Sequence, residues 1–313
     1  MPKVSVIVPN YNHAPFLQER MESILNQIYQ DFEVIILDDC STDNSREIIE
    51  SYRTHPKISK IIYNDINSGN TFVQWNKGIE QARGEWIWIA ESDDWCELNF
   101  LNTIFNKVQK VEQEKNYNIS LAYSNSYISD EFNNLNGIYD ENFALYQNDF
   151  YLEGKELIQK YFPYLNIIPN ASAVIFRKKL ITSIVINDLL HFKINGDWFL
   201  WINLLLNGNC LFISEPLNYF RRHYGASSSK NVLNFKNIEE AIRINVFLEK
   251  KGFNIVNKKY WLKFWLNQAN FNLKKILKTN FFSIYIQAIK IYPFSFSYLI
   301  FKILKRKFKF LFS

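Results

Sequence analysis

Six acidic side chains gather in two short stretches of the chain, "DDCSTDNS" and "ESDDW". They are Asp38, Asp39, Asp43, Glu91, Asp93 and Asp94. Neighbouring carboxylates raise one another's pKa and destabilise the folded state unless a positive charge lies between them. A divalent cation supplies that charge, and hard cations such as Mg²⁺ and Mn²⁺ prefer oxygen ligands of this kind. If the fold brings the two stretches together they indicate a cation site; if it does not, each Asp is a helix cap.

The residues in front of these stretches are typical of buried strands. Apolar, β-branched runs occupy residues 4–8, 33–37, 58–63 and 85–90. Apolar residues at helical spacing predict helices at 16–28, around 48–49 and at 71–83. Ser41 or Thr42 is the expected cap of the second helix. Strands that alternate with helices form a mostly parallel sheet, and ligands bind beyond the carboxyl ends of its strands, where the acidic stretches lie.

Composition narrows the class of protein. The 313 residues are 48% apolar, enough for one large core or for a domain with a smaller appendage. Cys40, Cys96 and Cys210 are too few and too widely spaced for a disulfide framework or a zinc site, and they fit a reducing cytoplasm. We expect no signal peptide and no transmembrane helix, because polar residues and a proline interrupt the apolar stretch 281–301.

Five stretches, taken in order, make the chain similar to the family 2 glycosyltransferases, which have the GT-A fold. They are "VSVIVPNYN", "VIILDDCSTDNS", "NSGNTFVQWNKGIEQARGEWIWIAESDDW", "GDWFLW" and "YRRHYGASSS". The resemblance implies an α/β, Rossmann-like fold with a mostly parallel sheet flanked by helices. It implies a catalytic domain at 1–230, with a nucleotide-sugar-binding part at 1–127 and an acceptor part at 128–230. Residues 231–313 are expected to form a helical, basic and aromatic C-terminal region.

The resemblance also assigns donor-binding residues. Those implied to contact the nucleotide sugar are Pro9, Tyr11, Asn12, Asp39, Lys77, Glu91, Asp93 and Arg222. Asp39 is implied to bond the imide edge of a uracil-like base. Arg222 is implied to hold phosphate, because its planar guanidinium bonds two oxygens at once.

A divalent cation, Mg²⁺ or Mn²⁺, is implied between the donor phosphates and Asp93, Asp94 and His223. The sequence does not rank the two Asp residues. Two positions depart from the family's pattern: Glu91 stands where many members have Asp, and Trp75 where many have Arg. Lys77 is either a substitute for that Arg or a solvated side chain.

Asp197 is implied to be the general base of an inverting transfer. It precedes a helix whose apolar residues are expected to be buried. On residue type alone a carboxylate at this position is an N-terminal cap. The resemblance favours the base, a contribution of roughly 10²–10⁴ in rate.

The expected acceptor segment, residues 128–170, is rich in Asn and Tyr and shows little periodicity. Sugar rings stack on aromatic faces, so Tyr139, Phe143 and Tyr146 are candidates for acceptor binding. The alternative for each is packing under a long loop.

The last 20 residues carry Phe and Leu on one side and Lys and Arg on the other. This pattern suits the surface of an anionic membrane, or else a helix packed on the catalytic domain. Nucleic acid is not an expected partner, because no nucleic-acid-binding motif accompanies the basic cluster.

The resemblance thus implies an enzyme that moves a sugar from a nucleotide diphosphate, with a UDP-sugar expected, to a glycan or lipid-linked acceptor of surface polysaccharide. Its expected place is the cytoplasm, peripheral at the inner face of the membrane. Two alternatives stay open: a sugar-phosphate nucleotidyltransferase with the same acidic edge, and a non-catalytic, membrane-associated nucleotide-sugar-binding protein.

Overall fold

The structure, a computed structural model, describes residues 1–255 apart from 116–117, 141, 169 and 224–234. The apolar stretch 281–301 and the basic tail therefore lie outside the described residues. The chain divides into two units, residues 1–158 with 166–226 and residues 159–165 with 227–313. All the residues predicted to contact donor or cation, and Asp197, belong to the first unit.

Strands and helices alternate over the first 90 residues, as predicted. Their bounds are β1 Val4–Asn10, α1 Ala14–Leu25, β2 Phe32–Asp38, α2 Ser45–Ser51, β3 Ile58–Tyr63, α3 Thr71–Gln81 and β4 Trp86–Ile89. β1 pairs in parallel with β2 and with β4, and β2 pairs in parallel with β3. The carboxyl ends of these four strands therefore lie along one edge of the sheet.

Later strands extend this into a ten-stranded sheet of order β3-β2-β1-β4-β9-β6-β10-β5, with β7 on β6 and β8 on β10. Their bounds are β5 Trp95–Cys96, β6 Ile119–Ser129, β7 Leu135–Ile138, β8 Phe150–Glu153, β9 Val174–Arg177 and β10 Asn209–Arg221. β9 is antiparallel to β4 and β6, whereas β10 is parallel to β6. The predicted α/β fold is confirmed, with a parallel first half and a mixed second half.

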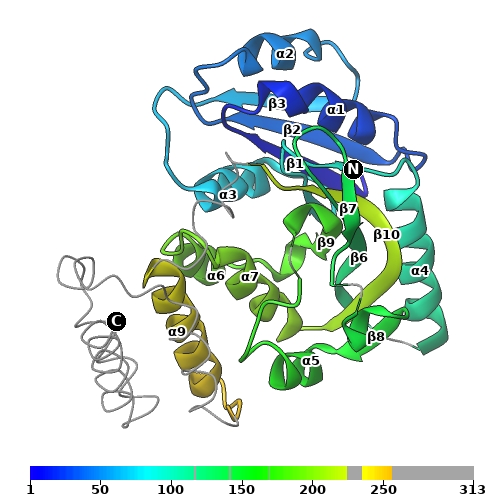
Figure 1. The fold of residues 1–313 in the computed structure, drawn as a ribbon, viewed down its shortest axis with the longest axis vertical. Coiled ribbons are helices and arrows are strands. Elements are labelled where there is room, and N and C mark those ends of the chain that lie inside the picture. Colours follow the sequence, from blue (N-terminus) through cyan, green and yellow to red (C-terminus); the bar gives the residue numbers. More distant parts are fainter. Residues whose placement is uncertain (116–117, 141, 169, 224–234, 256–313) are drawn as a thin grey trace, which may run out of the picture. The chain divides into compact units, whose positions relative to one another are not determined.

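Helices cover both faces of the parallel half (Figure 1). α1 and α4 (Phe100–Lys115) share one core cluster with the sheet, which includes Val6 of β1, Leu17 of α1 and Phe100 of α4. α3 packs on the opposite face, where Gly78 lies so close to Ile7 that a Cβ would overlap its side chain. Among the four parallel strands, β3 at the edge is half-exposed, whereas β1, β2 and β4 are buried. These buried β-branched strands give the loops at their carboxyl ends a rigid support.

The predicted cap of α2 is wrong. α2 begins at Ser45, whose backbone N–H donates to Oδ1 of Asp43. The Ser41 hydroxyl instead accepts from the backbone N–H of Asn12, and the backbone N–H of Thr42 donates to Oδ1 of Asn12. The polar residues after β2 therefore hold the turn after β1 in place.

The remaining described helices follow the parallel half. They are α5 Gly154–Lys160, α6 Ser183–Leu189, α7 Gly196–Leu205 and α9 Phe235–Lys250, with the short 3₁₀ turns η1 Ala144–Tyr146, η2 Ala171–Ala173 and η3 Lys178–Leu180. The apolar residues of α7 are buried, as predicted for the helix that carries Asp197. Within the described ranges, no helix has the length and apolar character needed to cross a membrane.

Candidate active site

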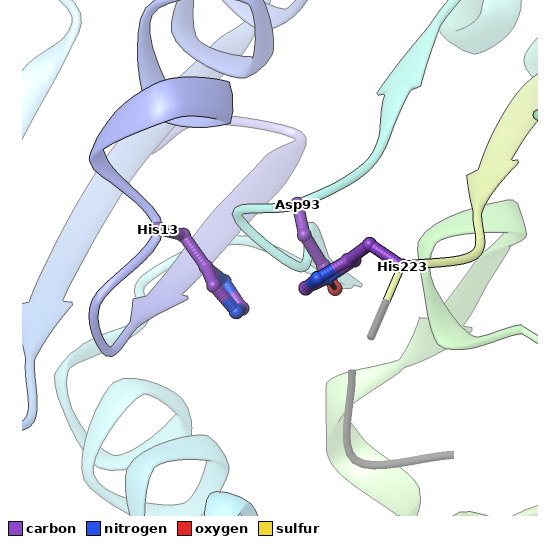
Figure 2. Close-up of side chains that lie close together, drawn as sticks. All are labelled: His13, Asp93 and His223. Atoms are coloured by element: carbon purple, nitrogen blue, oxygen red, sulfur yellow. Dashed lines mark hydrogen bonds and ion pairs between the residues drawn. The ribbon is translucent and has the colours of Figure 1, made fainter. Parts of the chain in front are cut away.

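Three segments far apart in the chain meet beyond the carboxyl end of the parallel strands. His13 follows β1, Asp93 follows β4 and His223 follows β10, and their side chains lie close together in Figure 2. One ligand atom from each lies within 4.8 Å of the other two. Nε2 of His223 is 3.0 Å from Oδ2 of Asp93, and Nδ1 of His13 is 2.8 Å from Oγ of Ser92. The spacing of these three side chains suits a metal ion, and we call them the His–Asp–His group.

The surroundings of Asp93 keep its carboxyl ionised. Burial by itself raises the pKa of Asp93, but the hydrogen bond with His223 and the electrostatic interactions with His13 and His223 lower it, and the net shift is downward. An anionic carboxylate beside imidazole nitrogens is a donor set that binds divalent cations. The residues present therefore fit the divalent cation that the resemblance implies.

Both oxygens of Asp94 accept hydrogen bonds from the protein. Oδ1 accepts from the backbone N–H of Arg221 at 2.9 Å, and Oδ2 accepts from Asn170 at 2.9 Å and from Ser172 at 2.6 Å. Burial raises the pKa of Asp94 to about 6, and the charge of Asp93 adds to the rise. Asp94 ties the loop after β4 to β10 and η2, and it is not a member of the His–Asp–His group. Its predicted role as a cation ligand stays a prediction.

Glu91 and Trp75, the two departures from the family's pattern, are bonded to each other. Nε1 of Trp75 donates to Oε1 of Glu91 at 2.8 Å, and the backbone N–H of Glu91 donates to Oγ of Ser172 at 3.1 Å. Burial raises the pKa of Glu91 to about 8, and the charge of Asp93 adds to the rise. The Glu91 carboxylate is thus held by α3 and is not a member of the His–Asp–His group.

A buried arginine lies beneath this acidic loop. Arg20 of α1 has its guanidinium carbon 5.0 Å from the ring centroid of Trp88 in β4. Its charge opposes the rise that burial causes in the pKa of Glu91 and Asp94. Arg20 therefore stabilises negative charge in the loop that carries Asp93.

The end of β10 is fixed by Arg221. Its guanidinium carbon lies 4.3 Å from the ring centroid of Phe16 and 4.4 Å from that of Trp95, and its Nη2 is 2.5 Å from a carboxylate oxygen of Glu19. Two rings and one ion pair therefore hold the segment from which His223 projects.

Asp39 and Lys77, both predicted to contact the donor, belong to one hydrogen-bond network. Oδ1 of Asp39 accepts from the Asn64 side chain at 2.6 Å, the Ser68 backbone N–H at 2.9 Å and the Gln74 side chain at 2.8 Å. Oδ2 of Asp39 accepts from the Ser68 hydroxyl at 2.7 Å. Nζ of Lys77 donates to Oδ1 of Asn64 at 2.7 Å. Because the Asn64 side chain also donates to Asp39, Lys77 is linked to Asp39 through one intervening side chain.

The turn after β1 brings the other predicted nucleotide residues to the same edge. Asn12 has φ +56°, in the left-handed region that Asn tolerates, and its Oδ1 accepts from the backbone N–H of Thr42 at 2.7 Å. Pro9 is buried in β1, whereas Tyr11 exposes 44% of its surface. Tyr11 is therefore the residue of this turn with a ring open to a ligand.

Helix α3 links the two acidic loops to α7. Gln74 donates to Asp39 after β2, and the next residue, Trp75, donates to Glu91 after β4. The ring of Trp75 also lies 6.3 Å from the ring of Trp201 in α7. A shift of α3 would therefore change its contacts with both loops and with α7.

Asp197 lies in the first turn of α7 and is half-buried. Its Oδ2 accepts from Nδ2 of Asn166 at 3.0 Å, which orients the carboxylate. Gly196 packs against Phe72 of α3, and a Cβ on Gly196 would lie 2.6 Å from that ring. The absence of a side chain at residue 196 therefore lets α7 approach α3.

Arg222, which was predicted to bind phosphate, is not among the three residues of the His–Asp–His group. Arg222 is exposed, with its guanidinium carbon 5.4 Å from the ring centroid of Phe220.

Tyr146 is buried. Its hydroxyl donates to the backbone oxygen of Ile167, and its ring centroid lies 5.1 Å from that of Phe212. Tyr146 therefore serves in packing, which was the alternative to acceptor binding.

Sequence reasoning missed His13, Asn170 and Ser172. His13 directly follows "PNYN" at the end of the first predicted strand, so its place in the topology was a usable indication. Asn170 and Ser172 bond Asp94 from 76 and 78 positions away, and their residue types mark no chemistry in the sequence. Only the fold brings them to the site.

Comparison with known proteins identifies the family of the chain. The family model "Glycosyl transferase family 2" matches residues 5–164. The chain is 32% identical over 237 residues to the glycosyltransferase GlyG of Streptococcus pneumoniae, covering 71% of this chain and 72% of GlyG. It is 38% identical over 97 residues to the poly(ribitol-phosphate) β-N-acetylglucosaminyltransferase TarS of Staphylococcus aureus, covering 30% of this chain and 17% of TarS.

Solved structures share the fold. TarS residues 1–349 in complex with UDP-GlcNAc superpose with a TM-score of 0.61 at 22% identity, covering 85% of this chain and 72% of that one. The mannosyltransferase PcManGT of Pyrobaculum calidifontis, in complex with GDP-Man and Mn²⁺, gives 0.51 at 16% identity, covering 93% and 74%. Together with the family model and GlyG, these likenesses show that the chain belongs to glycosyl transferase family 2 and has the GT-A fold.

Proposed function

We propose that this chain is an inverting, metal-dependent glycosyltransferase that moves a sugar from a UDP-sugar to a glycan or lipid-linked acceptor in surface polysaccharide biosynthesis. The observation that carries the proposal is the meeting of His13, Asp93 and His223 beyond the carboxyl ends of the parallel strands, at the edge of the sheet where Asp39 follows β2. The TarS complex with UDP-GlcNAc supports a uridine nucleotide. Family membership favours sugar transfer over the nucleotidyltransferase alternative.

The turn after β1 and the loop after β2 hold the nucleoside. Oδ1 of Asp39 accepts three hydrogen bonds and Oδ2 accepts one, so Oδ2 has the greater capacity to accept from the imide N–H of uracil. The exposed ring of Tyr11 is available for stacking on the base. Pro9 and Asn12 shape the backbone of the turn, and Lys77 supplies positive charge beside it.

The diphosphate side of the donor faces the His–Asp–His group. Asp93 and His223 would hold the divalent cation, and the exposed guanidinium of Arg222 would bind phosphate oxygens. When bound, a divalent cation supplies Lewis-acid stabilisation to the departing diphosphate. Glu91 and Asp94 hold the loop that carries Asp93. Glu91 is bonded to α3, and Asp94 is bonded to η2 and β10.

Asp197 acts as the general base. Its carboxylate takes the proton of the acceptor hydroxyl while the new bond from acceptor oxygen to anomeric carbon forms and the bond from that carbon to the phosphate oxygen breaks. Asn166 orients the carboxylate through its bond to Oδ2. Attack opposite the leaving group inverts the configuration of the anomeric carbon.

The acceptor is a surface glycan, either free or carried on a lipid. TarS, whose name specifies poly(ribitol-phosphate), supports a cell-surface polymer as the acceptor class. A lipid-linked acceptor would be reached from the membrane surface, to which the basic and aromatic segment 294–313 would bind; that segment lies outside the described residues.

A nucleotide-sugar screen tests the proposal. UDP-, GDP- and CMP-linked sugars are added with and without MnCl₂, and the melting temperature of the full chain is measured, because a ligand of the native state raises it. UDP-sugars are expected to raise the melting temperature, more so with Mn²⁺, and to release UDP when a surface glycan is added. A rise with GDP- or CMP-sugars alone would overturn the UDP assignment, and no rise with any nucleotide sugar would overturn the donor class.

A further inference from the structure

We propose that His13 is a ligand of the catalytic cation, so that the protein presents two imidazoles and one carboxylate to it. The inference rests on the proposed metal dependence and deepens it by naming a ligand and a metal preference. His13, Asp93 and His223 offer ligand atoms within 4.8 Å of one another, and Figure 2 shows the three side chains close together.

The ring of His13 is oriented as a ligand would be. Its Nδ1 lies 2.8 Å from Oγ of Ser92, a side chain with no exposed surface and the immediate neighbour of Asp93. Histidines that bind metals use one ring nitrogen for the metal and bond the other to the protein, which fixes the tautomer and the direction of the ring. With Nδ1 bonded to Ser92, the cation binds Nε2.

Packing holds the two imidazoles beside each other. Their ring centroids are 5.5 Å apart and nearly perpendicular, at 84°, and the ring of Phe16 lies 5.0 Å from His223 and 6.3 Å from His13. Phe16 is itself held by the Arg221 guanidinium. The backbone on each side is also fixed, since His13 directly precedes α1 and His223 follows β10.

As a ligand, His13 takes the role that was predicted from the sequence for a second carboxylate, Asp94. Asp94 is committed to donors on Asn170, Ser172 and Arg221. Replacing an oxygen donor by an imidazole changes which metal binds best. Mg²⁺ favours oxygen ligands and keeps several of its waters, whereas Mn²⁺, a first-row transition metal, binds an imidazole nitrogen more strongly than Mg²⁺ does. The site is therefore expected to bind Mn²⁺ more tightly than Mg²⁺.

The test measures metal binding directly, without turnover. Metal-free, full-length protein saturated with UDP is titrated with MnCl₂ or MgCl₂ in a calorimeter, and nitrogen couplings of bound Mn²⁺ are measured by pulsed electron paramagnetic resonance. The wild type should show couplings from two imidazoles. His13→Gln should retain one, lose about 10- to 100-fold in Mn²⁺ affinity and lose less in Mg²⁺ affinity. His191→Gln, the same change at an exposed histidine, should leave both affinities unaltered.

A second variant guards against misfolding of His13→Gln. Ser92→Ala keeps His13 but releases Nδ1, and it should weaken Mn²⁺ binding by about tenfold or more. Unaltered Mn²⁺ affinity and two imidazole couplings in His13→Gln would overturn the inference while leaving the metal-dependent function intact, provided that Asp93→Asn and His223→Gln still lose the metal. Equal affinity of the wild type for Mn²⁺ and Mg²⁺ would overturn the preference, and no metal binding by the wild type would overturn the metal dependence itself.

Discussion

The indole of Trp75 and the carboxylate of Glu91 form one hydrogen-bonded unit between α3 and the loop after β4, with Nε1 of Trp75 2.8 Å from Oε1 of Glu91. Each residue departs from the family's pattern, and the structure shows that the two departures meet. An indole N–H donates a hydrogen bond but carries no charge. The pair therefore keeps the connection between α3 and the acidic loop without placing a positive charge beside Glu91, which favours the protonated form of its carboxyl.

Glu91 should make the metal-free protein less stable as pH rises. Burial, and then the charge of Asp93, raise its pKa to about 8 from the ordinary 4.5. Between these pH values the folded state keeps a proton that the unfolded chain has released. The contribution of this proton to the free energy of unfolding is therefore fully present below about pH 4.5. It is lost as pH rises through about 8, at no more than about 1.4 kcal/mol per pH unit. Urea unfolding of wild type and Glu91→Gln in EDTA, at about pH 5 and pH 8, measures this. The variant should lose less stability over that interval, and equal losses would contradict the assignment.

Trp75→Phe gives the opposite change at the same pair. The hydrogen bond from Trp75 lowers the pKa of Glu91, so its removal should raise that pKa further and extend the loss of stability to pH values above about 8. Urea unfolding that shows the same loss above about pH 8 as in the wild type would show that the bond contributes little to the ionisation of Glu91.

Asp93→Asn and Asp94→Asn should separate a cation ligand from a structural carboxylate. Asp94 accepts from two side chains and one backbone N–H, and an amide nitrogen placed against those donors should cost about 1–3 kcal/mol of unfolding free energy. Asp93→Asn should cost less stability and abolish Mn²⁺ binding. Urea unfolding and calorimetry measure the two effects. A loss of Mn²⁺ affinity in Asp94→Asn as large as that in Asp93→Asn would make Asp94 a ligand, as the sequence predicted.

Gly196→Ala should disturb Asp197 through packing. The new Cβ would lie 2.6 Å from the Phe72 ring, and overpacking of a buried contact costs about 1–3 kcal/mol. We expect lower stability and slower transfer, because the first turn of α7 carries Asp197. Phe72→Leu in the same chain should restore part of both, with Phe72→Leu alone as the control. If the double variant is no more stable than Gly196→Ala, the contact is not the cause.

Asp197→Asn should abolish transfer but leave donor binding nearly intact. The amide cannot take the proton of the acceptor hydroxyl, so the rate should fall by roughly 10²–10⁴. The amide can still accept the bond from Asn166 through its oxygen. Initial rates of UDP release and UDP affinity by calorimetry give the two quantities. A comparable loss of UDP affinity would place Asp197 in donor binding.

Removal of residues 294–313 should release the protein from liposomes that contain anionic lipid. The segment combines Phe and Leu with the basic side chains of Lys302, Lys305, Arg306, Lys307 and Lys309. Each basic residue near an anionic surface contributes about 1 kcal/mol, an attraction that salt screens. Co-sedimentation at low and high salt measures binding, and liposomes of neutral lipid are the control. Persistent binding of the truncated chain would place the membrane contact elsewhere.

Much of the fold could be predicted because its first half depends on local patterns. The β-branched runs of β1, β2 and β4 and the apolar spacing of α1 and α3 reveal themselves within short windows. The antiparallel β9 could not be placed in this way. Its four residues, Val174–Arg177, pair with β4 and β6, which lie far away in the chain, so its direction depends on long-range packing.

The position of the site in the fold could be predicted from the sequence, but the directions of its side chains could not. The carboxylates after β2 and β4 lie at the edge that the strand order predicts. The direction of each side chain is another matter, because Asp93 and Asp94 are adjacent and yet one meets His223 while the other meets Ser172. Hydrogen-bond partners from η2 and β10 decide between them, and no local pattern in "ESDDW" carries that information.

The ion pair between Arg221 and Glu19 spans 202 positions of the chain. During synthesis the segment around Glu19 leaves the ribosome long before Arg221 exists, so this clasp and His223 just beyond it are among the last parts of the catalytic unit to arrive. The parallel strands can pair earlier, since their contacts are closer in sequence. A nascent chain halted before residue 221 can therefore pair its parallel strands, but its His–Asp–His group is incomplete because His223 has not yet been added.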